Sequence, residues 1–314
     1  MNNFVSMKTM TQAEISHLIK RTDWFASSKD ADQSTGKKRF VTNLFYEPST
    51  RTKLSFEVAE KRLGFEVIDF QVDHSSVVKG ESVYDTAKTI ASIGAEAVVI
   101  RHPQENAVQE LAEQLDIPVI NAGDGAGEHP TQSLLDLYTM YKEFRNFKDL
   151  NVLIAGDIVH SRVARSNAYA LRTLGANVSF ASKPEWQDHS LDFPYVDLDD
   201  AIETADVVML LRIQSERHQD AENDGKDTYL QQYGLTVERE GRMKKEAIIM
   251  HPAPVNRNVE IADELVECER SRIFKQMEYG VYARMAVLDH LLNWEEEQQY
   301  GDHYQTLYAR VNQF

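Results

Sequence analysis

Short apolar runs rich in β-branched and aromatic residues alternate with longer amphipathic segments along most of this chain. The alternation is typical of βαβ units, in which helices join parallel strands and cover the faces of the sheet. Candidate strands form two series, at 40–45, 65–70, 97–101 and 118–121, then at 151–155, 177–181, 206–211 and 247–250. Candidate helices cover 52–63, 82–93, 106–115, 131–144, 162–174 and 259–268. The sequence therefore predicts an α/β fold with two mainly parallel sheets, each flanked by helices.

A turn-rich segment with three glycines, 122–130, separates the two series of strands. The 314 residues of the chain are enough for two domains, and we place the junction at this segment. The first domain is expected to span 1–132 and the second 133–283, with a helical segment at about 284–314 that returns to the first domain. Segment 214–232 is rich in charge and poor in apolar residues, so it is interpreted either as a lid or as a solvated loop.

The charge balance limits the partners of this chain. Thirty-four Lys and Arg residues against 50 Asp and Glu residues give a net charge of −16, which disfavours binding to nucleic acid or to an anionic membrane. Any anionic ligand must therefore be held by locally gathered cations. A single cysteine, Cys268, and the absence of an apolar stretch of about 18 residues indicate a cytoplasmic protein. The sequence contains no dinucleotide, P-loop or zinc motif, and we expect neither a cofactor nor a metal.

Polar clusters directly after the apolar runs are the candidate binding sites, because ligands of open α/β sheets bind at the carboxyl ends of the strands. The first cluster is Ser49, Thr50, Arg51 and Thr52, at the start of a predicted helix. Hydroxyl groups, a guanidinium group and the unpaired N–H groups of a helix start can together hold a phosphate. An ordinary helix cap with a solvated arginine is the alternative interpretation.

Two further clusters each contribute a basic or aromatic nitrogen. Arg101 ends a predicted strand, where pairing with an acidic residue is the alternative role. His129 precedes Pro130, a residue that suits the first turn of a helix, so the imidazole would lie at the positive helix end and stay neutral. A neutral imidazole can polarise a carbonyl group, although a lone histidine is more often structural.

The second series contributes two arginines at separate strand ends, Arg162 and Arg212, with Gln214 near the latter. Two guanidinium groups of this kind would suit a ligand with two carboxylates. Ion pairs with some of the 50 acidic residues are the alternative for either arginine. Between a strand and a helix of the first series, the segment with Ser75 and Lys79 is, by itself, a surface loop with one lysine.

Four segments occur in one order that resembles the aspartate/ornithine carbamoyltransferase family: Ser49-Thr50-Arg51-Thr52, His129-Pro130-Thr131-Gln132, Arg212-Ile213-Gln214 and His251-Pro252-Ala253-Pro254. The resemblance covers nearly the whole chain. It implies an enzyme that transfers the carbamoyl group of carbamoyl phosphate to the amine of L-aspartate, a step of pyrimidine biosynthesis. Ornithine-specific members carry a Cys where this chain has Pro252, and they carry a Ser-Met-Gly loop that is absent here. Ala253 stands where some members have Leu.

The resemblance also implies roles for single residues. Ser49, Thr50, Arg51 and Thr52 would bind the phosphate, and Thr52, Arg101 and His129 would donate to the carbamoyl oxygen. Gln132 and the carbonyl groups of Pro252 and Ala253 would orient the carbamoyl nitrogen. Arg162 would bind the α-carboxylate of aspartate, and Arg212 with Gln214 the β-carboxylate. Ser75 and Lys79 would reach the site of a neighbouring subunit in a homotrimer.

Two other functions remain open from the sequence. The chain could carbamoylate another amine, such as ornithine or a polyamine, and a screen of products would separate these acceptors. It could also be a non-catalytic anion-binding protein of the same fold, which would bind ligand without turnover. The sequence leaves open whether further chains join the trimer.

Overall fold

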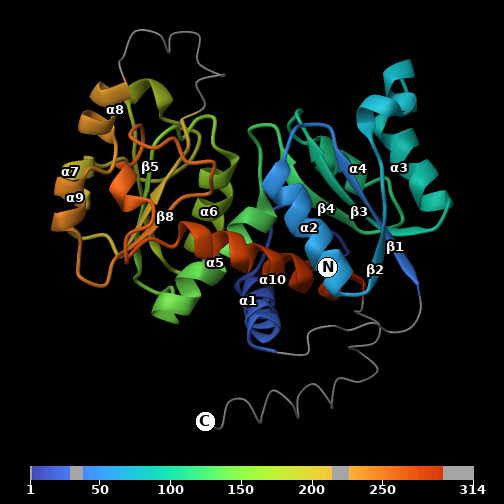
Figure 1. Ribbon diagram of the computed structural model, residues 1–314, viewed down its shortest axis with the longest axis horizontal. Coiled ribbons are helices and arrows are strands. Elements are labelled where there is room, and N and C mark those ends of the chain that lie inside the picture. Colours follow the sequence, from blue (N-terminus) through green and yellow to red (C-terminus); the bar gives the residue numbers. More distant parts are fainter. Residues whose placement is uncertain (1, 29–37, 214–225, 293–314) are drawn as a thin grey trace.

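The computed structural model describes residues 2–28, 38–213 and 226–292, which form two four-stranded parallel sheets (Figure 1). The first sheet has the order β2-β1-β3-β4 and the second the order β6-β5-β7-β8. The strands of the first sheet are β1 (Arg39–Phe45), β2 (Phe65–Ile68), β3 (Ala95–His102) and β4 (Val119–Asp124). Those of the second are β5 (Asn151–Ala155), β6 (Asn177–Ala181), β7 (Val207–Leu210) and β8 (Ile248–Met250).

Helices connect and cover these strands. They are α1 (Gln12–Ser27), α2 (Thr50–Arg62), α3 (Val83–Ser92), α4 (Ala107–Ala112), α5 (Pro130–Phe144), α6 (Arg162–Thr173), α7 (Leu198–Ala201), α8 (Lys226–Tyr233), α9 (Val237–Arg242) and α10 (Ile273–Leu292). The predicted α/β fold with two mainly parallel sheets and a C-terminal helix is confirmed. The predicted limits of the two domains stay a prediction.

One apolar core runs through both halves of the molecule. It joins the inward face of the first sheet, with Val41 and Val99, to that of the second, with Ile154 and Met209, through α1, α5 and α10. Two separate clusters lie on the outer faces, one under α3 and α4 and one under α7 and α9. Alternate strand residues thus point into different cores, as expected for sheets buried on both sides.

Helix α10 lies at the junction of the two halves, beside α1, α2 and α5 (Figure 1). A buried ion pair joins it to α1, where Nε of Arg21 lies 2.6 Å from Oδ2 of Asp289. The helix therefore returns to the first half, as predicted, but it begins at Ile273 rather than near 284. The rest of the predicted segment, 293–314, lies outside the described residues.

The predicted helix at 259–268 is wrong. The backbone of Glu260 and Ala262 pairs with Leu235, which excludes helical hydrogen bonds there, and Asn258 adopts a positive φ of 60°. Only one turn of 3-10 helix, Asp263–Leu265, forms in this stretch. The segment 214–232, which the sequence left open, contains most of α8; residues 214–225 lie outside the described part.

Helix α1 was not predicted from the sequence, although Thr11 and Glu14 form a capping box at its start. Within the described residues, no helix combines the length and the apolar character needed to span a membrane.

Candidate active site

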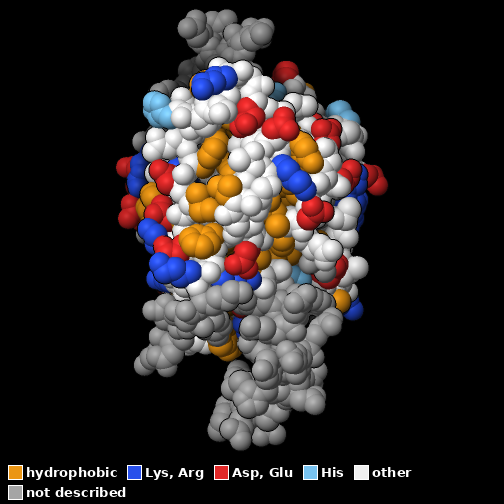
Figure 2. All heavy atoms as spheres, turned by 90° about the vertical axis from the view of Figure 1, so that its right-hand side faces the viewer, with side chains coloured by type: hydrophobic (Ala, Val, Ile, Leu, Met, Phe, Trp, Pro, Cys, Tyr) orange, Lys and Arg blue, Asp and Glu red, His pale blue; other side chains and the backbone are white. Residues whose placement is uncertain are grey.

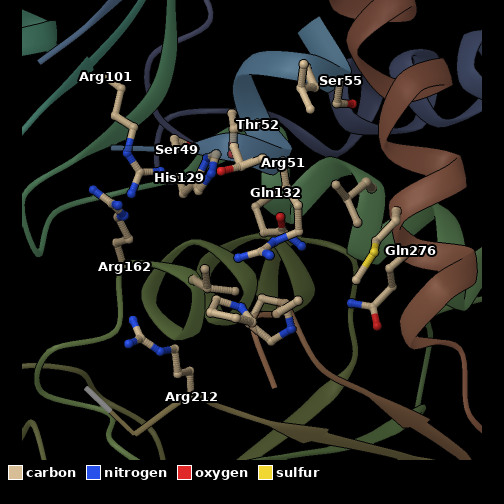
Figure 3. Close-up of a pocket in the computed structure, with 18 of the residues that line it drawn as sticks. Ser49, Arg51, Thr52, Ser55, Arg101, His129, Gln132, Arg162, Arg212 and Gln276 are labelled. Atoms are coloured by element: carbon tan, nitrogen blue, oxygen red, sulfur yellow. The ribbon is translucent and has the colours of Figure 1, made fainter. Parts of the chain in front are cut away.

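A cavity of about 960 Å³ opens where the strands of both sheets end. Its lining brings together predicted residues from six strand ends. Figure 3 shows the guanidinium groups of Arg101 and Arg162 close to each other at one side of the pocket, with Arg212 below them. The predicted residues in the lining are Ser49, Thr50, Arg51, Thr52, Arg101, His129, Gln132, Arg162, Arg212, Pro252 and Ala253.

The start of α2 supplies one wall of the cavity. Ser49 is the N-cap residue, with an extended φ of −157°, and its side chain makes no hydrogen bond to the helix. Its hydroxyl group and the N–H groups of the first turn therefore remain available for an anion. Thr52 is buried on the inner side of this turn, whereas Arg51 is exposed at its rim. Partial burial, and then the charge of Arg212, lower the pKa of Arg51 from its usual value.

Arg101, near the end of β3, and Arg162, at the start of α6, come from different halves of the molecule and meet at one carboxylate. Oε2 of Glu47 lies 3.0 Å from Nε of Arg101 and 3.1 Å from Nη1 of Arg162. Nη1 of Arg162 also donates to the carbonyl oxygen of Gly125 at 3.2 Å. All three side chains are largely buried, so their charges act through a medium that screens less than water does. Glu47 thereby fixes two cations of the cavity against each other.

His129 is buried at the start of α5, where it is the N-cap residue before Pro130. Burial, together with the charges of Arg162, Arg101 and Arg284, holds the pKa of its imidazole well below the usual value. The ring is therefore neutral at physiological pH, as the sequence predicted. Its backbone N–H donates to Oγ of Ser166 on α6 at 3.0 Å, which ties the start of α5 to the second half.

The loop after β8 also lines the cavity. The backbone N–H of Ala253 donates to Nδ1 of His251 at 2.9 Å, and Nε2 of the same ring lies 3.0 Å from Oε1 of Glu260. Because Nδ1 accepts, Nε2 carries the proton and donates to the carboxylate. Ala253 has a positive φ of 55°. The imidazole thus holds Pro252 and Ala253 in a fixed turn at the cavity.

Two of the predicted site residues, Ser75 and Lys79, do not line this cavity. Gln214 lies outside the described residues. Ser75 lies between the short 3-10 helices η1 (Val72–His74) and η2 (Ser76–Lys79), and Lys79 is the last residue of η2. Ser75 caps η2 with its hydroxyl oxygen, which accepts from the N–H of Val77, and Lys79 is exposed. No group of three or more His, Cys, Asp or Glu side chains is placed to hold a metal ion, as far as the described ranges extend.

The lining also contains one carboxylate, one amide and one guanidinium group that were not predicted from the sequence: Glu47, Gln276 and Arg284. Glu47 comes two residues before the predicted phosphate cluster, and an acidic residue next to a candidate anion site was the available signal. Gln276 and Arg284 come from α10, and both are buried, with Arg284 only 3 % exposed. Burial lowers the pKa of Arg284 to about 10, against the opposing effect of Asp136. Gln276 and Arg284 lie within a helix rather than at a strand end, so the search for polar residues after the strands did not find them.

Comparisons with known proteins agree with this geometry. The carbamoyl-phosphate-binding domain of the aspartate/ornithine carbamoyltransferases matches residues 2–142, and the Asp/Orn-binding domain of that family matches residues 148–291. The aspartate carbamoyltransferase catalytic subunit of Staphylococcus carnosus is 56 % identical over 297 residues, which cover 95 % of this chain and 97 % of the relative.

Solved structures extend the likeness to three dimensions. The aspartate transcarbamoylase of Trypanosoma cruzi, in complex with carbamoyl phosphate and aspartate, superposes with a TM-score of 0.81 at 29 % identity, over 91 % of this chain and 95 % of that one. The catalytic subunit of M. jannaschii aspartate transcarbamoylase superposes with a TM-score of 0.81 at 35 % identity, over 94 % of this chain and 99 % of that one. The chain belongs to the aspartate/ornithine carbamoyltransferase family.

Proposed function

We propose that this chain transfers the carbamoyl group of carbamoyl phosphate to the amine of L-aspartate, which yields N-carbamoyl-L-aspartate and phosphate. The observation that carries the proposal is the convergence of Arg51, Arg101, Arg162 and Arg212 on one cavity, in a chain with a net charge of −16. Such a cavity suits two anionic substrates held side by side. The names of the relatives in the comparisons, and the ligands of the T. cruzi complex, support the same reaction.

The start of α2 binds the phosphate group. Ser49, Thr50 and Thr52 supply hydroxyl groups, and the first turn supplies backbone N–H groups that point toward an anion. Arg51 offsets the negative charge that builds up on the phosphate as it leaves. A stabilising group of this kind acts in the transition state more than in the ground state, and so it raises kcat.

The carbamoyl group lies deeper in the cavity. Arg101, Thr52 and the neutral His129 donate to its oxygen, on which negative charge develops when the amine attacks. Gln132 and the carbonyl groups of Pro252 and Ala253 accept from its nitrogen. The amine attacks the carbon directly, the tetrahedral species collapses, and the departing phosphate takes up the amine proton. No protein base is required.

The second sheet binds the acceptor. Arg162 holds the α-carboxylate of aspartate, and Arg212 with Gln214 holds the β-carboxylate. Positioning of the amine next to the carbamoyl carbon supplies a large part of the rate enhancement. Glu47 pairs with both Arg162 and Arg101 and so holds these two side chains, one from each half, in fixed positions relative to each other.

The test is a product analysis with carbamoyl phosphate and a panel of amines that contains aspartate, ornithine and putrescine. We expect N-carbamoyl-L-aspartate as the product, and tight competitive inhibition by N-(phosphonacetyl)-L-aspartate, which joins an analogue of each substrate. Carbamoylation of ornithine or putrescine in preference to aspartate would overturn the proposed acceptor. Ligand binding without any product would overturn the enzymatic function itself.

The assembly we propose is a homotrimer in which Ser75 and Lys79 complete the site of a neighbouring subunit. Their segment lies at one side of the molecule with α3, where Val78, Tyr84 and Ile93 are exposed. Figure 2 faces this side and shows apolar side chains gathered between charged ones. An exposed apolar patch of this kind supports an interface between copies of the chain.

Mixed trimers test whether the sites are shared. Chains with Arg51→Ala and chains with Lys79→Ala are each expected to be nearly inactive. In every hybrid trimer one of the three sites has both residues, so random mixing of equal amounts restores about a quarter of the wild-type sites. Absence of recovery, with mixing verified by native mass spectrometry, would contradict a shared site.

We place the reaction in the cytoplasm, as a step of pyrimidine biosynthesis. The single cysteine of the sequence, Cys268, is a free thiol in the structure, which suits a reducing compartment.

A further inference from the structure

Asp136 is a carboxylate in the middle of α5, one turn after Gln132, and it is fully buried. Three side-chain amides from three helices surround it. Oδ1 accepts from Nε2 of Gln132 at 2.9 Å and from Nε2 of Gln276, on α10, at 2.8 Å. Oδ2 accepts from Nδ2 of Asn167, on α6, at 2.8 Å. The carboxylate is thus a common acceptor for groups that the fold brings together from distant parts of the chain.

All three amides donate to the oxygens of Asp136, so this side chain fixes which end of each neighbouring amide faces it. Gln132 must turn its NH₂ group toward Asp136. The oxygen of the Gln132 amide is then the atom left for a ligand in the cavity, which Gln132 lines. Without this partner, the amide could turn by 180° at little cost and present NH₂ groups to the ligand instead.

Gln276 also links Asp136 to the loop after β8. Because Nε2 of Gln276 donates to Asp136, Oε1 of Gln276 is free to accept, and it takes the backbone N–H of His251 at 2.9 Å. His251 in turn accepts from the N–H of Ala253 at 2.9 Å. The chain of contacts from Asp136 through Gln276 therefore ends at the residues whose carbonyl groups border the cavity.

Burial and the neighbouring polar groups have opposite effects on the pKa of the Asp136 carboxyl group. Burial raises its pKa to about 7, whereas the three amides and Arg284 act to lower it. Arg284 on α10 is buried as well, and its Nη1 donates to Oγ of Ser55 and to the carbonyl oxygen of Gly280. A charge so deeply buried is costly, and a neutral residue of similar shape would pack there more cheaply. The cost points to a role beyond packing.

We propose that Asp136 is a positioning residue that aligns the acceptor groups for the carbamoyl nitrogen, by orienting the Gln132 amide directly and the 251–253 loop through Gln276. The inference rests on the proposed function, since it assigns these acceptors to the carbamoyl group. It predicts a specific defect: loss of Asp136 impairs recognition of the NH₂ group of carbamoyl phosphate and spares recognition of the phosphate.

Acetyl phosphate makes this defect measurable, because it has a methyl group in place of the NH₂ group. The variant is Asp136→Asn, which keeps the shape but places an NH₂ group where an oxygen accepted. The measurements are the dissociation constants of carbamoyl phosphate, acetyl phosphate and inorganic phosphate, each by calorimetry on the intact protein. We expect carbamoyl phosphate to bind about 10- to 100-fold more weakly, the scale of a polar group left without its partner. Acetyl phosphate and phosphate should change less than about 3-fold.

A matched control lies on the same helix. Thr139 is fully buried, and its hydroxyl group donates only to the carbonyl oxygen of Leu135, so Thr139→Val alters a buried polar residue of α5 without touching the cavity. This variant should leave the ratio of the two affinities, carbamoyl phosphate to acetyl phosphate, at the wild-type value.

A second variant covers the case in which Asp136→Asn does not fold. Gln276→Met keeps the volume of the side chain and removes the link between Asp136 and His251, so it should lower the affinity ratio in the same direction. A loss that is equal for all three ligands, or an unchanged ratio in the folded variants, would overturn the proposal.

The failure of the proposed function would look different. Wild-type protein would then form no N-carbamoyl-L-aspartate, a result that is read from product analysis and not from the affinity ratio of the variants.

Discussion

Gly123 lies directly against the guanidinium group of Arg162: a Cβ atom added to the glycine would come within 3.0 Å of Cζ. Gly123 belongs to β4 of the first sheet, and Arg162 begins α6 of the second half. A backbone atom of one half therefore sets how far a cation of the other half can enter the cavity. Gly123 also has a φ of +117°, which side chains other than glycine rarely adopt.

Gly123→Ala should raise the KM for aspartate, by about 10-fold if Arg162 loses one charge-assisted hydrogen bond to the substrate. The guanidinium group cannot retreat freely, because Glu47 and the carbonyl oxygen of Gly125 already hold it. The KM for carbamoyl phosphate should change much less. Steady-state kinetics with each substrate varied in turn measures both values.

The control for this prediction is Gly94→Ala. Gly94 has a similar φ of +112°, but no atom lies within 4 Å of an added Cβ. Both variants should lose stability through backbone strain, and only Gly123→Ala should change the KM for aspartate. A similar change of KM in both variants would show that strain, not the contact with Arg162, is responsible.

Arg51→Ala should collapse turnover. The side chain lies at the rim of the cavity beside the proposed phosphate site. In the proposed mechanism it offsets the charge that develops as phosphate leaves. Loss of one such group costs roughly 3 to 4 kcal/mol, or about 10² to 10³ in kcat. Rapid-quench measurement of the chemical step tests the value. A large rise in KM with an unchanged kcat would assign Arg51 to ground-state binding alone.

Arg212→Ala should act on the acceptor instead. In the proposed site the guanidinium group contacts a carboxylate that does not react, so its loss would weaken the binding of the ground state and of the transition state alike. We expect the KM for aspartate to rise by about 10- to 100-fold, with a smaller change in kcat. The variant should also discriminate less between aspartate and amines without a β-carboxylate. Unaltered dependence on aspartate would contradict the assignment.

The sequence predicted correctly the elements that are determined by their own stretch of residues. Strands β5 and β6 lie at the predicted residues, because a run of buried apolar side chains ends at a turn on both sides. The helix predicted at 259–268 failed because its apolar spacing belongs to a stretch that pairs with Leu235 and sends Glu260 inward to His251. Tertiary contacts overrode the local periodicity there.

The sequence predicted those residues of the cavity that lie at or directly after the ends of strands. Arg101, Arg162 and Arg212 meet because the carboxyl ends of parallel strands share one edge of each sheet. Asp136, Gln276 and Arg284 were not predicted. They lie on helices, and the packing of helices brings residues together across about half the chain. Gln276 and Asp136, for example, are separated by 140 residues. No spacing rule in the sequence reports a contact of that range.

A buried carboxyl group outside the cavity gives a prediction on stability. Glu60 on α2 is fully buried, and its Oε2 accepts from Nδ2 of Asn43 on β1 at 2.9 Å. Burial raises the pKa of Glu60 to about 7 from 4.5. The folded state therefore holds a proton that the unfolded state releases between these values, so this stabilisation is complete below pH 4.5 and is lost as the pH rises through 7.

Glu60→Gln should remove this loss, because a neutral amide has the shape of the protonated carboxyl group and can still accept from Asn43. The difference in unfolding free energy between variant and wild type should grow in favour of the variant by up to about 3 kcal/mol from pH 5 to pH 8. Urea unfolding of both proteins at the two pH values measures it, and the other carboxyl groups cancel in the difference. Glu57→Gln serves as the control, since Glu57 lies on the same helix in an exposed pair with Lys61. A difference that stays constant with pH would mean that Glu60 is ionised in the folded protein throughout this range.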